Sequence, residues 1–361
     1  MTEYAGLKRA TSPDWPAFCD CLRRKGTPRR VHHMELFHDE SSEQAIGERL
    51  GLLDGLDATA ADYIPQRRIR VYRALGFDYI PVRMGPPWSL RFDKIADTEG
   101  RPGSRSFLNE HVGPITNWKE FEEYNWPKPD GPETIEPLKW FSKNVPDDMC
   151  LVVPGQGHYC EFLCWLMGYE SFCFALYEQR DLVEALYAKL HGYFQAMLKC
   201  VLQFERVKVI FGSDDMGFKT GLMFSPADMR RYVLSGHKQL VEMTHAAGRI
   251  YALHACGNLV DIMDDLIDDV KIDAKHSFED TILDVRDAKA RFGRRVSLVG
   301  GIDVDFLCRQ DEAAIRRRVR ETLDVCMPGG GYCLGTGNSV ANYIPVDHYL
   351  AMVDEGRLWG A

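Results

Sequence analysis

Eight short apolar runs, each followed by a polar turn and a helix-like stretch, constrain the fold of this chain most strongly. Such alternation is typical of parallel βαβ units, and eight units close into a (β/α)8 barrel. An open doubly wound sheet alternates similarly, but no G-x-G-x-x-G turn follows the first run. We therefore predict an α/β fold, a single (β/α)8 TIM barrel over residues 1–361. The predicted strands are residues 31–37, 79–84, 150–154, 207–212, 249–254, 273–276, 296–300 and 331–335.

One of the intervening helices has recognisable ends. Ser225 is a good N-cap, Pro226 suits the first helical position, and Gly248 can end the helix before the fifth predicted strand. We expect a helix between these residues.

The stretch from residue 85 to residue 148 is much longer than one crossover helix. Within it, residues 90–95 and 104–108 flank a turn at 97–103 and predict a β-hairpin. This insertion follows the carboxyl end of the second predicted strand, and barrel enzymes place their active sites at that face. It is therefore either a lid over the site or a hairpin that merely covers the barrel.

Charge and hydropathy exclude two classes of partner. The chain has 44 Lys and Arg against 53 Asp and Glu, a net charge of −9, with no long basic run to bind nucleic acid. Its most apolar stretch, residues 162–177, contains Gly168 and Glu170 and is shorter than the roughly 20 residues that cross a bilayer. Glu3 and Lys8 leave no room for an apolar signal-peptide core. We expect a soluble cytoplasmic protein whose eleven cysteines are mostly reduced.

Two residues at the end of the fifth predicted strand suggest a metal site. His254 and Cys256 are two apart, so both side chains can lie on one face of the strand. Cys333 lies on the eighth predicted strand, which opens onto the same barrel mouth. One imidazole and two thiolates suit zinc and leave a fourth position for substrate or water. The alternative is that these cysteines are buried as small hydrophobic residues.

Three segments resemble the uroporphyrinogen decarboxylase superfamily, namely residues 254–258 (His-Ala-Cys-Gly-Asn), 300–303 (Gly-Gly-Ile-Asp) and 331–333 (Gly-Tyr-Cys). The resemblance runs from about residue 150 to the C-terminus and is weaker before it. Within the superfamily the chain looks most like the zinc-dependent corrinoid methyltransferases, the methylcobamide:thiol methyltransferase and O-demethylase branch. That resemblance implies a barrel in which His254, Cys256 and Cys333 bind zinc.

Several further polar residues stand at predicted strand ends. Asp214 and Asp215 follow the fourth strand, and adjacent residues of an extended segment point opposite ways. One of them is therefore a candidate catalytic acid, since a buried acid without a partner is costly; the resemblance also implies a functional acid here.

The remaining candidates each have a structural alternative. His158 follows two glycines and could line a substrate pocket or lie on a surface loop. Asp303 could bind substrate or cap the next helix. Glu35 could bind substrate or metal, or form a salt bridge. His276, near the end of the sixth strand, could line the mouth, but a lone histidine at a strand end is more often structural.

The resemblance implies methyl transfer between a small molecule, a thiol or a methyl ether, and a corrinoid, with Zn²⁺ as Lewis acid. Because the chain lacks a D-x-H-x-x-G cobalamin signature, the corrinoid is expected on a separate protein. The first alternative is metal-free decarboxylation of a porphyrinogen. It is disfavoured because residues 31–38 hold no arginine-rich segment for tetrapyrrole carboxylates. The second alternative is a catalytically idle barrel that binds a ligand or partner.

Overall fold

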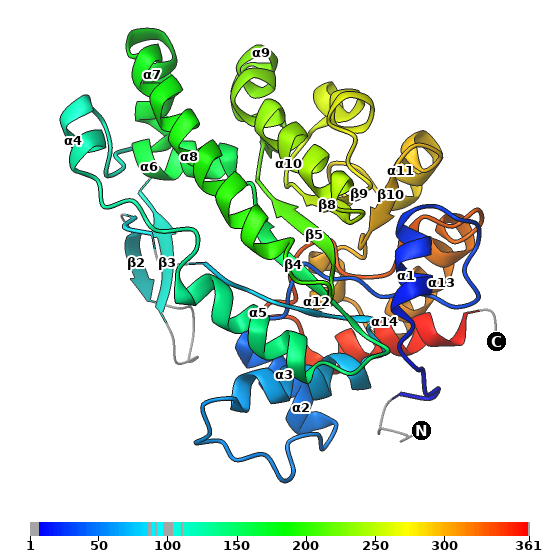
Figure 1. Ribbon diagram of the computed structural model, residues 1–361. Helices are drawn as coiled ribbons and strands as arrows, with labels where there is room; N and C mark the ends of the chain where they lie inside the picture. The colour runs from blue at the N-terminus through cyan, green and yellow to red at the C-terminus, as the bar shows by residue number, and fades with distance from the viewer. Residues whose placement is uncertain (1–6, 86–87, 91, 97–103, 110, 360–361) are drawn as a thin grey trace.

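The computed structural model describes residues 7–85, 88–90, 92–96, 104–109 and 111–359. Its centre is a curled sheet of seven parallel strands in the order β1-β4-β5-β8-β9-β10-β11, which is also their order along the chain (Figure 1). These strands correspond to seven of the eight predicted runs. Their bounds are β1 (Tyr79–Pro81), β4 (Cys150–Gln156), β5 (Val207–Ser213), β8 (Ile250–His254), β9 (Ala274–His276), β10 (Ser297–Val299) and β11 (Tyr332–Cys333).

The first predicted strand, residues 31–37, is not a strand of this sheet. It lies beside β11 through isolated parallel bridges, His33 to Leu334 and His38 to Val340. On its other side, the backbone N–H and C=O of Glu35 bond to the Tyr79 hydroxyl at 3.0 and 2.9 Å. A side chain of β1 therefore takes the place of ladder hydrogen bonds, so this segment is not paired with β1 as a strand. The described residues show a seven-stranded α/β sheet, not the expected eight strands.

Helices connect successive strands and cover the outside of the sheet (Figure 1). The predicted helix after β5 is confirmed: α9 begins at Pro226, and the Ser225 hydroxyl accepts a hydrogen bond from the Asp228 N–H at 3.1 Å. It continues through a π-helical turn, η1 (Arg230–Leu234), into α10 (Ser235–Ala246). The other α-helices are α1 (Trp15–Leu22), α2 (Glu40–Arg49), α3 (Tyr63–Ala74), α4 (Trp118–Glu123), α5 (Pro132–Asn144), α6 (Tyr159–Met167), α7 (Tyr169–Glu178), α8 (Arg180–Val201), α11 (Val285–Phe292), α12 (Val304–Arg309), α13 (Glu312–Cys326) and α14 (Val346–Leu358).

Short elements complete the fold. The predicted hairpin is present as antiparallel strands β2 (Phe92–Ala96) and β3 (Ser104–Leu108), while its expected turn at 97–103 lies outside the described residues. It lies on the side of the molecule away from both chain ends (Figure 1). A second small hairpin, β6 (Gly217–Phe218) and β7 (Gly221–Leu222), follows β5. Between β8 and β9 the chain forms a 3₁₀ turn, η2 (Val260–Ile262), and a π-helical turn, η3 (Asp265–Val270).

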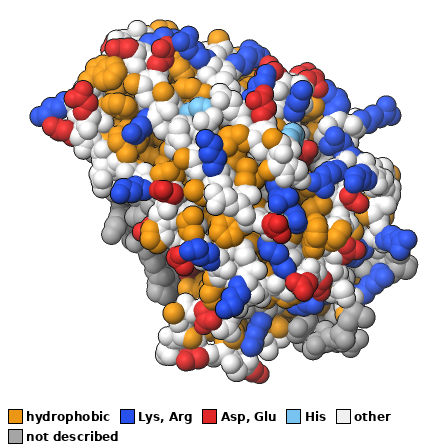
Figure 2. Space-filling model, in the orientation of Figure 1, with side chains coloured by type: hydrophobic (Ala, Val, Ile, Leu, Met, Phe, Trp, Pro, Cys, Tyr) orange, Lys and Arg blue, Asp and Glu red, His pale blue; other side chains and the backbone are white. Residues whose placement is uncertain are grey.

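The surface is mixed in charge on the face that Figure 2 draws, where Lys and Arg side chains alternate with Asp and Glu around small apolar areas. No helix within the described ranges is both long and apolar enough to cross a membrane. All eleven cysteines lie in described segments, and all are free thiols.

A buried carboxylate ties the N-terminal region to the sheet. Asp78, directly before β1, is fully buried and accepts hydrogen bonds from the Asp14 N–H at 2.6 Å and from Arg30. Its second oxygen lies 2.7 Å from Nδ1 of His32. This one carboxylate therefore connects the start of α1 and the segment beside β11 to the first strand.

Replacing Asp78 with Ala should destabilise the fold strongly, because it leaves buried donors without an acceptor. We expect the free energy of unfolding to fall by about 3–5 kcal/mol in urea denaturation. The control is Asp347→Ala, which removes an exposed ion pair with Arg49 and should change stability little. Equal effects of the two substitutions would contradict this role of Asp78.

Candidate metal centre and adjoining cavity

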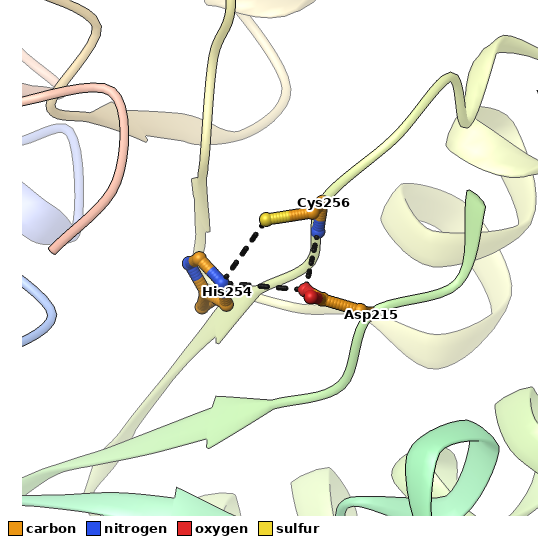
Figure 3. A group of neighbouring side chains, drawn as sticks. All are labelled: Asp215, His254 and Cys256. Atoms are coloured by element: carbon orange, nitrogen blue, oxygen red, sulfur yellow. Dashed lines mark hydrogen bonds and ion pairs between the residues drawn. The ribbon is translucent and has the colours of Figure 1, made fainter. Parts of the chain in front are cut away.

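Three side chains from neighbouring strand ends converge at one point (Figure 3). His254 ends β8, Cys256 follows it two residues later, and Asp215 follows β5, which pairs with β8. Nε2 of His254 lies 3.4 Å from both Sγ of Cys256 and Oδ1 of Asp215. The Cys256 N–H also donates to Oδ1 of Asp215 at 2.9 Å. The expected pairing of His254 with Cys256 is thus present, and Asp215 is the third member.

The backbone after Cys256 needs glycine to make this arrangement. Gly257 has φ +93°, in the left-handed region that other residues rarely adopt. A Cβ there would lie 2.0 Å from the carbonyl oxygen of Gly217 in the β6–β7 hairpin. The close approach holds the turn after Cys256 against the loop that carries Asp215.

A hydrogen-bonded histidine pair sets the proton positions on His254. Nε2 of His276 lies 3.1 Å from the Thr336 carbonyl, which only accepts, so this nitrogen carries the proton. Burial and the nearby His254 hold the pKa of His276 well below its usual value, so the ring is neutral and its Nδ1 accepts. That Nδ1 lies 2.8 Å from Nδ1 of His254, which must then be the donor. Nε2 of His254 therefore faces Asp215 and Cys256: with a proton it donates to the Asp215 carboxylate, and without that proton it offers a lone pair to a cation.

The acid and the thiol of this cluster have opposite pKa shifts. Burial alone would raise the pKa of Asp215, but hydrogen bonds and charge from His254 and the Cys256 N–H outweigh it and lower the pKa. Burial, together with the Asp215 carboxylate, raises the pKa of the Cys256 thiol well above its usual value. Without a cation, the group is therefore a carboxylate beside a neutral thiol.

Cys333, the expected third ligand, does not join the cluster. It lies within β11, opposite Val299 of β10, fully buried and next to the thiol of Cys21 on α1. The residue that reaches the cluster from this segment is Asn338, whose Nδ2 donates to Sγ of Cys256 at 3.4 Å. Cys333 is the last residue of β11 but precedes Asn338 by five residues, and each extended residue advances the chain by about 3.3 Å. It is therefore too early in the segment to reach the mouth.

Asp214, the neighbour of Asp215, points the other way and positions a helix. Its two oxygens accept the N–H groups of Cys160 and Glu161, each at 2.9 Å, at the first turn of α6. His237 of α10 lies 3.0 Å from the same carboxylate. Burial, and next the charge of Glu161, raise the pKa of Asp214 well above its usual value. Of the two candidate acids, only Asp215 reaches the cluster and the cavity beside it.

A cavity of about 370 Å³ opens beside the cluster, a volume within the range of small-molecule sites. His158, predicted as a pocket residue, lines it together with Glu161 of α6. Nδ1 of His158 lies 2.6 Å from Oε2 of Glu161. Burial would lower the pKa of His158, but the Glu161 carboxylate outweighs it and raises the pKa. The lining residues are Leu36, Phe37, Arg83, Met84, Pro154, Gly155, His158, Glu161, Ser213, Asp215 and His254.

The remaining two candidates have other neighbours. The Asp303 side chain caps α12 by accepting the Phe306 N–H at 3.0 Å, and it lines a different cavity, of about 560 Å³. Glu35 is buried behind the mouth, where its carboxyl group contacts the Thr336 N–H at 2.9 Å and the Thr336 hydroxyl at 2.6 Å. Neither lies in the group formed by Asp215, His254 and Cys256.

Comparison with known proteins places the chain in a family. A family model for uroporphyrinogen decarboxylase (URO-D) matches residues 112–359, more than half of the sequence. The chain belongs to the URO-D family. The solved structure of a methyltransferase from Methanosarcina mazei has a similar fold, with a TM-score of 0.68. Its sequence is 17% identical, and the match covers 96% of this chain and 98% of that one.

A second solved structure is more distant from the URO-D chain. This candidate vitamin-B12-independent methionine synthase from Listeria monocytogenes has a TM-score of 0.48 and 13% identity, over 92% of this chain and 97% of that one. No curated protein matches the sequence. At these identities the M. mazei likeness establishes the shared fold and nothing finer.

Sequence reasoning left three participants of the URO-D site without a role. His276 was taken as structural, yet it sets the tautomer of His254. Asn338 and Ser277 contact Sγ of Cys256, at 3.4 and 3.7 Å. His276 stands at the end of β9 as His254 stands at the end of β8, and this shared position in the barrel pattern was the one signal that could have found it.

Glu35 should make the stability of this URO-D protein depend on pH. Burial raises its pKa to about 8 from 4.5, despite the hydrogen bonds from Thr336. The Thr336 hydroxyl also lies 2.5 Å from the Asn338 carbonyl, and its single proton cannot serve both acceptors, which favours a protonated Glu35.

Between about pH 4.5 and 8 the unfolded chain therefore loses a proton that the folded chain keeps. The free energy of unfolding should fall as the pH rises through this window, and Glu35→Gln should remove that part of the slope. Urea denaturation of both proteins from pH 5 to 8.5 measures the difference. Parallel curves would contradict the shift.

Proposed function

We propose that this chain is a zinc-dependent methyltransferase that moves a methyl group between a small molecule and a corrinoid carried by a separate protein. The observation that carries the proposal is the O, N and S donor set of Asp215, His254 and Cys256 beside a cavity of small-molecule size. A fold shared with a methyltransferase is consistent with it. The methyl donor or acceptor, a thiol or a methyl ether, would occupy the cavity.

The donor geometry fits zinc. Ligands of a tetrahedral zinc ion at usual bond lengths are about 3.4–3.6 Å apart. Nε2 of His254 is 3.4 Å from its two neighbours, and because His276 holds the proton of His254 on Nδ1, Nε2 is the nitrogen that would bind zinc after losing its own proton. Zinc would supply Lewis acidity and lower the pKa of the Cys256 thiol. Three protein ligands leave a position for substrate, the pattern of catalytic rather than structural zinc.

Proton handling in the cavity falls to His158 in this proposal. If Asp215 binds the metal, its carboxylate is not available as an acid. His158 has a raised pKa, and Glu161 bonds its Nδ1, so Nε2 remains to meet a ligand. When a methyl group leaves an ether oxygen, that oxygen keeps the bonding electrons and needs a proton, which His158 would donate.

We also propose that two segments complete the site. Residues 85–148 would act as a lid, because Trp88 packs on Phe162 of α6, with ring centroids 4.3 Å apart, beside the cavity. Residues 31–38 would close the sheet into a barrel in place of an eighth strand, since they bridge to β11 and contact Tyr79 of β1.

Zinc content should distinguish the ligands from the other cysteines. Cys256→Ser and Asp215→Asn should each lower zinc affinity by about tenfold or more, since even replacing a residue that hydrogen-bonds to a metal ligand costs about 10–100-fold. Cys333→Ser is the matched control and should keep the zinc, because this thiol is buried next to Cys21. Zinc per chain, measured by elemental analysis after dialysis, tests both. Loss of zinc in the Cys333 variant alone would overturn the assignment.

Activity separates this proposal from its alternatives. Zinc-loaded protein mixed with cob(I)alamin and a panel of methyl ethers and methylated thiols should form methylcobalamin, followed by its visible spectrum. His158→Asn should reduce the rate with ethers at least tenfold without loss of zinc, since general acid catalysis contributes about 10²–10⁴-fold. Decarboxylation of uroporphyrinogen by metal-free protein would instead show that the chain is a porphyrinogen decarboxylase. A protein that holds no zinc and shows no turnover would instead be a binding protein.

A further inference from the structure

Arg83 is a cationic side chain of the cavity that takes no part in the proposed metal binding or proton transfer. Arg83 follows β1 and lines the same cavity as Asp215 and His254. Its guanidinium lies over the ring of Phe37, with Cζ 3.7 Å from the ring centroid. This stacking holds the guanidinium at the cavity wall, and Arg83 as a whole is exposed.

Arg83 is the cavity cation for which the described residues supply no carboxylate. Glu161 is paired with His158, and Asp215 with His254. Outside the cavity, Glu43 pairs with Arg67 and Arg68, and no ion pair joins Asp39 to Arg83. The pKa of Arg83 is lowered because burial and then the charge of Arg68 outweigh the acids Asp39 and Glu43, which act to raise it.

The rest of the wall is suited to an apolar body. Leu36, Phe37, Met84 and Pro154 line the same cavity as Arg83, Asp215 and His254. A ligand that fills it would meet a fixed cation, apolar side chains, and the Asp215–His254 edge. An arginine fork binds a carboxylate through two parallel hydrogen bonds.

We infer that the small molecule bound in this cavity carries a carboxylate that pairs with Arg83, while its apolar body lies against Leu36, Phe37 and Met84. This inference rests on the proposed function for the other end of the ligand, where the methylated heteroatom would lie at the cluster. Arg83 is then a specificity-determining residue that selects anionic methyl donors over neutral ones of the same shape.

Two probes of equal shape test the inference without turnover. Binding of 4-hydroxybenzoate and of 4-hydroxybenzamide is measured by calorimetry, in zinc-loaded and in chelator-treated protein. Wild type should prefer the carboxylate by about 10–100-fold, the strength of a hydrogen bond to a charged group. Arg83→Met should abolish that preference, and Arg83→Lys should keep part of it. The matched control is Arg49→Met, an exposed arginine of α2 that pairs with Asp347.

Two kinds of result would overturn the inference. Equal binding of acid and amide to wild type shows that the cavity does not select a carboxylate. A preference that survives in Arg83→Met, or that disappears only when zinc is removed, places the carboxylate on the metal or elsewhere. If the Arg83-dependent preference holds but no methyl transfer occurs, the proposed function fails and the carboxylate site stands.

Discussion

Two adjacent carboxylates at the end of β5 hold the site together. Asp214 points toward α6 and α10, where it accepts two helix N–H groups and contacts His237. Asp215 points toward β8, where it contacts His254 and the Cys256 N–H. Because neighbouring residues of an extended chain face opposite ways, one strand end positions both the helix that carries His158 and the candidate metal ligands.

The polar groups around the cluster form a chain that extends to the last strand. Thr336 accepts from His276, which accepts from His254, while the Thr336 hydroxyl and N–H contact the buried Glu35. The orientation of His254 thus depends on residues from β9, the loop after β11 and the segment beside it. A substitution at His276 would change the hydrogen bonding of His254 although His276 is not itself a member of the donor set.

Much of this arrangement was predictable from local pattern. Periodicity placed seven of the parallel strands and the helix that starts at Pro226, because apolar runs and capping residues act over a few positions. The spacing of His254 and Cys256 at a strand end placed two members of the cluster together. Cys333, the third predicted ligand, is chemically suited to zinc, but in the structure it lies in β11 opposite Val299, and Asp215 after β5 stands beside His254 and Cys256 instead.

By itself, the sequence determined the alternation of strands and helices, the two-residue spacing of His254 and Cys256, and the adjacency of Asp214 and Asp215. These are short-range properties that follow from side-chain volume, polarity and the two-residue period of a strand. The tertiary structure alone decided which aspartate faces the cavity, that residues 31–37 bond to Tyr79 rather than form a strand, and that His276 orients His254. These outcomes depend on strand register and on which buried donor meets which acceptor, and both arise between residues far apart in the chain.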